Sequence, residues 1–257
     1  MIEHMFDHGP MAVPSPDLAV LRQLGDRVRP LSAAAERTLP VPVPLADLLP
    51  QRGLVRGTTV ATSGAAASSL AYALVGPATR AGSWCATVGV TDLGLVAAAE
   101  LGVDLSRTLV VADGGPQRWA SSVAALLDAV EVVLVRPSHD VTPTTRRRLI
   151  ARARDRGAVL VQVGGRASVW SEGPDLTLAT RTVRWEGIEV GHGRLRARLV
   201  EVEVSGRRGA DRPRRASIWL PGPDGAMAAA PASPASSSPG GTAADGSPQP
   251  VTWREVG

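Results

Sequence analysis

The chain has 257 residues, of which 44% are hydrophobic, and this suits one α/β domain with tails or at most two small domains. All 28 basic residues are arginine, and a formal net charge of +4 does not by itself indicate a nucleic-acid partner. The single cysteine, Cys85, excludes an internal disulfide and argues against a cysteine-based metal site. We expect Cys85 to be a small buried hydrophobe within a strand.

No apolar run approaches the roughly 20 residues that cross a bilayer. The first 11 residues lack both the basic start and the apolar stretch of a secretion signal. These features predict a cytoplasmic protein without membrane contact.

Residues 1–38 are predicted to form an N-terminal extension with one short helix, Asp17–Arg29. Its apolar residues recur at helical spacing, and they are Leu18, Leu21, Leu24 and Val28. Pro30 lies just beyond the end of this helix. The pattern fits equally well a helix that packs on another protein and a helix that covers the domain's own sheet.

Residues 39–225 are predicted to form the core. Leu39–Pro50 is interrupted by prolines and should be extended rather than helical. Strands and helices then alternate, which indicates a mainly parallel sheet covered on both faces. The expected strands are Gly57–Thr62, Trp84–Val90, Thr108–Ala112, Glu131–Val135 and Ala158–Val163. The expected helices are Ser68–Arg80, bent or broken at Gly76 and Pro77, then Leu93–Leu101, Gln117–Ala129 and Thr142–Arg156.

After Gly173 the pattern changes to strands without intervening helices. The expected strands are Leu176–Arg184, Arg194–Val204 and Arg214–Leu220, which should be antiparallel additions at the sheet edge. The apolar alternation slips near Leu199, which predicts a bulge there.

Residues 226–257 are predicted to be a disordered tail, because they are almost devoid of bulky apolar side chains. Trp253 lies near the end of this tail. An exposed tryptophan beyond a flexible linker is suited to docking on a partner. The alternatives are an inert tail and a tail that folds back on the domain.

The segment RGLVRGTTVATSGAAASSLAYAL, which begins at Arg52, resembles the opening of a RecA-like nucleotide-binding core. Its nucleotide-loop positions are Thr62, Ser63, Gly64, Ala67, Ser68 and Ser69. Ser68 stands where this family places its magnesium-binding hydroxyl. Ala61 and Ala66 replace the two loop glycines, and Ala67 replaces the lysine that reaches the β- and γ-phosphates.

Further along, EVVLVRP resembles the Walker B strand of the same fold, with Arg136 in place of its metal-binding aspartate. A cation at that position opposes magnesium binding. The helix start after Gly64 still offers backbone N–H groups to an anion, but the missing lysine argues against tight ATP binding. We therefore expect a protein that is not an enzyme and that holds no cofactor or metal. The alternative role of the loop serines is helix capping and packing.

Three segments, LADLLPQRGLVRG, RWEGIEVGHGRLRARLVEVEVSG and RPRRASIWLPGPDG, resemble the actinobacterial ImuA-like proteins, which are RecA-related accessory factors. This resemblance implies a non-catalytic adaptor in DNA-damage-induced, error-prone translesion synthesis. Its expected partners are a Y-family DNA polymerase of the ImuB type and an error-prone polymerase of the C family. The alternatives are a divergent nucleotide-dependent DNA-binding ATPase and a structural regulator of RecA filaments.

The predicted edge strands are rich in arginine. The candidate DNA or partner contacts there are Arg194, Arg196, Arg198, Arg214 and Arg215. Strand alternation places the first three on one face, and such a row can bind phosphates. The alternative is that these arginines pair with Glu201 and Glu203 on a neighbouring strand and protect the sheet edge.

Overall fold

The computed structural model describes residues 37–90, 94–164, 173–189, 192–207 and 210–230. The predicted helix Asp17–Arg29 and the predicted docking residue Trp253 lie outside these ranges. Among the described helices, none is both long and apolar enough to cross a membrane.

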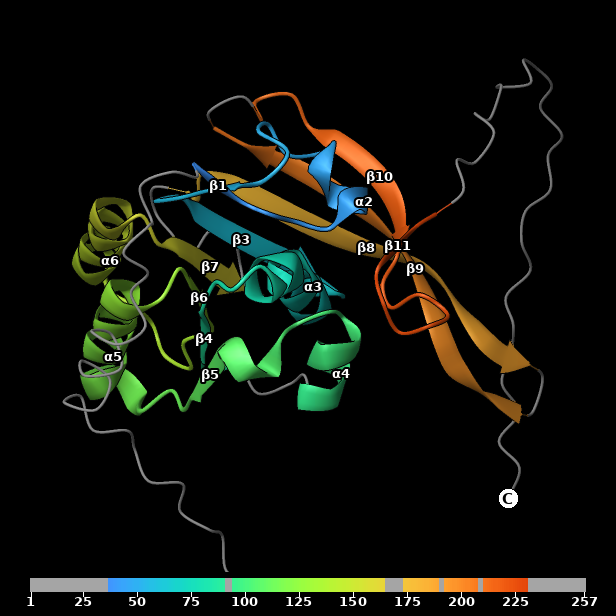
Figure 1. Cartoon of the computed structure of the whole chain (residues 1–257), viewed down its shortest axis with the longest axis horizontal. Coiled ribbons are helices and arrows are strands. Elements are labelled where there is room, and N and C mark those ends of the chain that lie inside the picture. The colour runs from blue at the N-terminus through green and yellow to red at the C-terminus, as the bar shows by residue number, and fades with distance from the viewer. Residues whose placement is uncertain (1–36, 91–93, 165–172, 190–191, 208–209, 231–257) are drawn as a thin grey trace, which may run out of the picture.

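One sheet dominates the described structure, with strand order β11-β10-β9-β8-β3-β7-β6-β4-β5 (Figure 1). Its parallel part consists of β3 (Thr59–Gly64), β4 (Cys85–Val88), β5 (Thr108–Val111), β6 (Val132–Val135) and β7 (Val159–Val163). The C-terminal part consists of β8 (Leu176–Glu189), β9 (His192–Gly206), β10 (Arg214–Trp219) and β11 (Ala228–Ala229). β8 is parallel to β3, whereas β9, β10 and β11 follow as antiparallel neighbours. The predicted α/β class, with antiparallel strands added to a mainly parallel sheet, is confirmed.

Helices cover both faces of the parallel strands. Helices α3 (Ala67–Arg80) and α4 (Leu95–Glu100) contribute to one apolar cluster, and α5 (Gly115–Ala129) and α6 (Pro143–Arg156) contribute to the other. The four residues of β6 alternate between the two clusters. This explains why β6 reads as an unbroken apolar run.

The ends of α6 follow local sequence rules. The Thr142 hydroxyl accepts a hydrogen bond from the amide of Thr145, and Gly157 closes the helix in the left-handed conformation, with a φ of +67°. A short 3₁₀ turn, η1 (Leu105–Arg107), precedes β5 and is capped by Asp104.

The prediction of an extended Leu39–Pro50 was wrong, because helix α2 (Val43–Ala46) lies within it. Proline is tolerated in the first helical turn, where its missing N–H group would have no helical partner anyway. The buried side chains of Leu45 and Leu49 anchor this segment in the core. β1 (Thr38–Leu39) and β2 (Leu54–Val55) flank it as a separate antiparallel pair.

A bend or a break was predicted at Gly76 and Pro77, and the helix is not broken there, since α3 continues through Pro77 to Arg80. The hydroxyl of Thr79 donates a 2.7 Å hydrogen bond to the carbonyl of Gly76 in this turn. Gly76 is required by packing, because a Cβ there would lie 2.9 Å from the carbonyl oxygen of Gly102.

The predicted bulge lies at the expected level of the sheet but on the partner strand. Thr182 pairs with Val200 and Arg184 with Leu199, so the extra residue is Val183 of β8. β11 (Ala228–Ala229) also extends the sheet into residues that were predicted to belong to the disordered tail.

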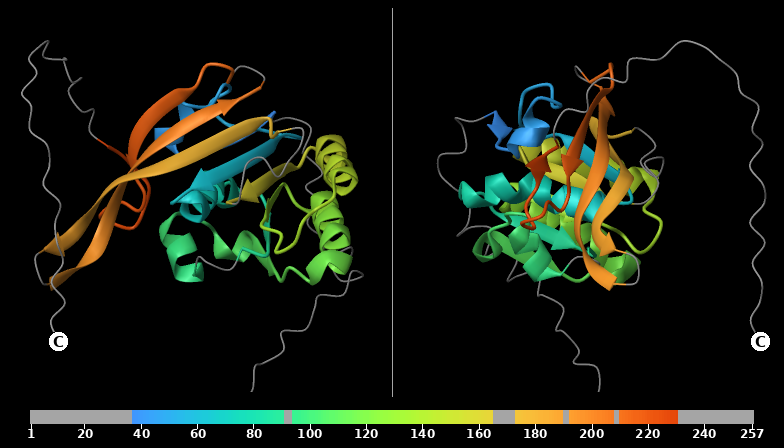
Figure 2. Two further views of the ribbon diagram at one scale, coloured as in Figure 1. Left: turned by 180° about the vertical axis from the view of Figure 1, so that it is seen from behind. Right: turned by 90° about the vertical axis from the view of Figure 1, so that its right-hand side faces the viewer.

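β8 and β9 are both longer than predicted. β3 pairs with β8 only as far as Thr180, and β10 pairs with β9 only from Leu199 onward. The remaining residues, 181–189 and 192–198, form a two-stranded projecting hairpin that extends away from the body (Figures 1 and 2).

Candidate functional site

The turn between β3 and α3 is held by β8. Gly64 adopts a φ of +88°, and a Cβ at this position would lie only 1.9 Å from the carbonyl oxygen of Thr180. The hydroxyl of Thr180 donates to the carbonyl of Ser63 at 2.8 Å and accepts from the amide of Ala66 at 3.1 Å. One amide of the predicted anion-binding turn is therefore already bound within the protein.

Arg136 reaches this loop from the end of β6. Its Nη2 atom donates a 2.6 Å hydrogen bond to the hydroxyl of Ser68, and its Nε atom donates to the carbonyl of Val163 at 3.0 Å. The structure thus brings together the two positions that, in the resembling family, share a magnesium ion. Here a guanidinium group contacts the hydroxyl directly.

Arg198 reaches the loop from β9. Its guanidinium group donates to the carbonyls of Leu220 at 2.8 Å and Ala65 at 3.2 Å, and to the hydroxyl of Ser69 at 3.3 Å. The residue is only 7% exposed, and burial lowers the pKa of its guanidinium below the ordinary arginine value. An arginine nevertheless remains charged at neutral pH.

Arg198 was predicted to share one strand face with Arg194 and Arg196 in a row that can bind phosphates, but its burial removes it from such a row. Alternation along the strand did not show that β9 runs beside the loop, where carbonyl groups need hydrogen-bond donors.

The remaining loop positions serve packing. Ala61, Thr62, Ala66 and Ala67 are buried, whereas Gly64 is exposed. The N-cap residue of α3 is Ala66, which has no side-chain cap, so the suggested capping role of the loop serines is wrong at this position. Ser68 and Ser69 instead accept hydrogen bonds from two arginines.

The other arginines of the predicted row are divided among different contacts. Arg215 donates to Glu203 at 2.6 Å, as the edge-pairing alternative predicted. Arg214 donates to the carbonyl of Asp47 at 3.2 Å and so links β10 to the segment after α2. Arg194 and Arg196 are exposed on the projecting hairpin. The five candidate arginines thus do not form one continuous surface.

A polar cluster follows β5 and β6, at the carboxyl ends of the parallel strands. One carboxylate oxygen of Asp113 accepts from the amide of Ser138 at 3.0 Å and lies 4.0 Å from Nδ1 of His139. The imidazole of His139 meets the buried Trp119 edge-on, with ring centroids 5.7 Å apart. A cavity of about 340 Å³ adjoins Arg136, His139 and Gln162.

This cluster was not predicted from the sequence. The sequence feature that could have indicated it is that Asp113 and His139 each follow the end of a strand, where α/β folds place binding sites. Among the described residues, no group of three His, Cys, Asp or Glu side chains could hold a metal ion.

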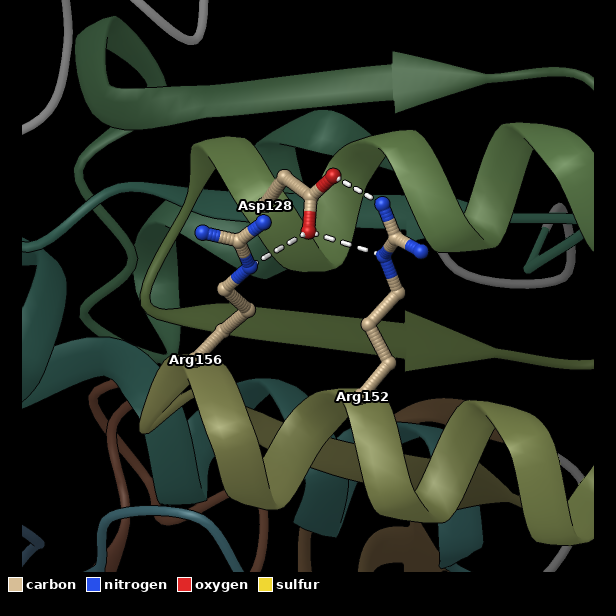
Figure 3. Close-up of polar contacts among 3 residues, drawn as sticks. All are labelled: Asp128, Arg152 and Arg156. Atoms are coloured by element: carbon tan, nitrogen blue, oxygen red, sulfur yellow. Dashed lines mark hydrogen bonds and ion pairs between the residues drawn. The ribbon is translucent and has the colours of Figure 1, made fainter.

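A second unpredicted cluster joins α5 to α6 (Figure 3). Asp128 accepts hydrogen bonds from Arg152 and lies 3.0 Å from Nε of Arg156. Burial alone would raise the pKa of the Asp128 carboxyl group, but the two guanidinium groups lower it below its ordinary value. This cluster is structural, since it ties the two helices of one face together.

Comparisons with known proteins agree with this architecture. Residues 47–171 match the family model described as the MT3502 N-terminal domain. The uncharacterized protein Rv3395c of Mycobacterium tuberculosis is 34% identical over 195 residues, which are 72% of this chain and 91% of Rv3395c. The chain belongs to the Rv3395c family.

The crystal structure of the RadB recombinase has a similar fold. It matches with a TM-score of 0.53 and 14% identity, over 72% of this chain and 96% of the RadB chain. The RecA-like fold predicted from the loop motif is thereby confirmed for this member of the Rv3395c family.

Proposed function

We propose that this member of the Rv3395c family is a non-catalytic, cytoplasmic RecA-like adaptor in damage-induced, error-prone translesion synthesis. It acts by contact with a Y-family polymerase of the ImuB type, and an error-prone C-family polymerase joins the same complex. The resemblance of three sequence segments to ImuA-like proteins supports this role. The RecA-like fold agrees with it.

The observation that carries the non-catalytic part of the proposal is the hydrogen bond from Arg136 to Ser68. Magnesium takes oxygen ligands, usually carboxylates and phosphates, and a cation at the place of the carboxylate repels it. The Ser68 hydroxyl is engaged by that same cation. Since Ala67 also replaces the phosphate-binding lysine, both the metal and the triphosphate lose their principal ligands.

A second candidate function is a divergent nucleotide-dependent DNA-binding ATPase. The observation that favours it is the presence of two arginines, Arg136 and Arg198, at the loop. Their positive charges could replace that of the missing lysine. Against this role, Arg198 is buried and donates to loop and neighbouring carbonyl groups rather than facing open solvent.

Two measurements on the full chain test the proposal. We expect no ATP hydrolysis with or without single-stranded DNA, and we expect the tagged chain to retain the purified Y-family polymerase in a pull-down. DNA-stimulated turnover that is lost in Ser68→Ala, but kept in Ser121→Ala on the exposed surface of α5, would establish the ATPase instead. Failure to retain the polymerase would refute the adaptor role.

A further inference from the structure

The projecting hairpin presents a tryptophan on a fixed support. Trp185 of β8 is 44% exposed, and the guanidinium carbon of Arg198 lies 4.8 Å from the centroid of its ring. Arg198 is itself held by the carbonyls of Leu220 and Ala65. One face of the indole is therefore backed by a cation that is itself held by hydrogen bonds, while the residue remains 44% exposed.

Two further arginines, Arg194 and Arg196, lie on the partner strand β9 of the same hairpin. Gly187 lies two residues beyond Trp185 along β8, and a Cβ on Gly187 would lie 2.9 Å from Cγ of Arg196. The stem of Arg196 thus covers the strand next to the tryptophan. Arg194, two residues before Arg196 in β9, is also exposed.

The charges of these two arginines are not neutralised by the carboxylates of the described chain. Within the described ranges, neither Arg194 nor Arg196 forms an ion pair, whereas Arg181 pairs with Glu201 and Arg184 with Glu186. An exposed aromatic ring with unneutralised guanidinium groups on the same hairpin is complementary to a base next to a phosphate.

The free edges of the hairpin are poorly suited to the alternative, which is addition of a strand from a protein partner. The register shifts between Thr182 and Arg184 and again between Glu186 and Ile188. Such irregularities interrupt the regular row of backbone groups that strand addition requires. A ligand that uses side chains on the face of the hairpin fits better.

We propose that the projecting hairpin binds single-stranded nucleic acid. An unpaired base stacks on the free face of Trp185, and Arg194 and Arg196 contact the adjacent phosphates. The surface lies on the hairpin and not in the loop after β3, although Arg198 contacts both. Its ligand adds to the polymerase contact proposed above. Arg198 is a positioning residue here, because it orients the ring from beneath.

The test uses the full chain and a fluorescein-labelled oligothymidylate of about 20 nucleotides, with fluorescence anisotropy at low salt. Because stacking contributes about 1–3 kcal/mol per base, Trp185→Ala should weaken binding by about fivefold to 150-fold, and Trp185→Phe should recover part of it. Replacing both arginines, Arg194→Gln and Arg196→Gln, should lower the slope of log K against log salt by about 1.4.

The matched control is Arg118→Gln, which removes one exposed positive charge from α5 and should leave binding nearly unchanged. A blunt duplex of the same length should bind more weakly, because its bases are not free to stack. Melting curves of Arg118→Gln and of the double arginine variant should coincide with that of the wild-type chain, since these three side chains are exposed.

The inference would be overturned if Trp185→Ala bound the oligonucleotide as tightly as the wild-type chain. It would also be overturned if Arg118→Gln weakened binding as much as the hairpin substitutions, or if the wild-type chain did not bind the oligonucleotide. If the hairpin variants instead lose only the polymerase in the pull-down, the hairpin is a protein-docking surface and the nucleic-acid inference is wrong. Retention of the polymerase by a chain that binds no oligonucleotide would leave the adaptor proposal intact, so the two proposals fail separately.

Discussion

Arg136 and Ser68, which are 68 residues apart in the chain, are joined by a hydrogen bond of 2.6 Å between Nη2 and the hydroxyl oxygen. Arg136 also donates to the carbonyl of Val163, at the end of the neighbouring strand. The first turn of α3, the end of β6 and the end of β7 are thus linked by one side chain. In an active RecA-like ATPase the corresponding groups meet through a bound nucleotide and its metal ion.

Removing the buried guanidinium of Arg198 should destabilise the fold. In Arg198→Ala the carbonyls of Leu220 and Ala65 lose their donor, and we expect the free energy of unfolding to fall by about 1–3 kcal/mol. Urea denaturation measures this loss. Arg196→Ala, two residues away on the exposed hairpin, serves as the control and should change stability by less than about 0.5 kcal/mol. Equal stability of the two variants would show that the Arg198 contacts contribute nothing.

Two glycines with left-handed backbones should respond differently to alanine. Gly82 has a φ of +96° with open space around it, so Gly82→Ala should cost only the conformational penalty of about 1–2 kcal/mol. Gly64→Ala adds a clash with the backbone of β8 and should cost about 3 kcal/mol or more. Thermal denaturation followed by circular dichroism compares them. Similar melting temperatures would mean that β8 does not pack on the loop as described.

The Asp128 cluster predicts a pH-dependent contribution to stability. Because the folded-state pKa of Asp128 lies below its ordinary value of 3.8, the stabilisation is complete above about pH 3.8 and is lost as the pH falls through the lowered folded-state value. All three side chains are partly exposed, so solvent screening limits the effect of Asp128→Asn at pH 7 to about 0.5–1 kcal/mol.

Urea denaturation at about pH 7 and about pH 3 would test this dependence. The difference between wild type and Asp128→Asn should narrow at the lower pH. Asp155→Asn, which removes an exposed carboxylate from α6, is the control and should show a smaller difference at neutral pH. A difference that stays constant between the two pH values would rule out the ion pairs as its source.

Cys85 should be chemically inert in the folded protein. It is fully buried in β4, and burial raises the pKa of its thiol above the ordinary value of 9.0, so little reactive thiolate is present. Iodoacetamide at about pH 8 should modify the native chain slowly and the chain in guanidinium chloride completely, as mass spectrometry will show. Rapid stoichiometric alkylation of native protein would contradict the position of this strand.

The parallel half of the fold could be predicted from sequence because its signals are local. The apolar run of β6 and the caps of α6, Thr142 and Gly157, each lie within a few residues of the structure they specify. Local rules gave a wrong result where tertiary packing outweighs them. Pro44 lies in the first turn of α2, and the packing of Gly76 against Gly102 accompanies a helix that continues through Pro77.

The site was only partly predictable for the same reason. The absence of lysine from the loop is visible in the sequence, and so is Arg136 at the metal-ligand position. The contact of Arg198 with this loop is not visible in the sequence, because Arg198 lies 129 residues from Ser69. The direction of its side chain also depends on which segment lies beside β9. The stacking of Arg198 on Trp185 could not be inferred from alternation either, since the bulge at Val183 changes the register between the two strands.

The central position of β3 has a practical consequence. It lies between β7 and β8, yet the family model ends at residue 171, before β8 begins. An expression fragment that ends at residue 171 would leave the β8-facing edge of β3 without its hydrogen-bonding partner. It would also lack Thr180 and Arg198, which form hydrogen bonds with the turn between β3 and α3. Unpaired edge strands form hydrogen bonds with the edge strands of other molecules. Such a fragment should therefore aggregate and precipitate rather than fold as an independent domain.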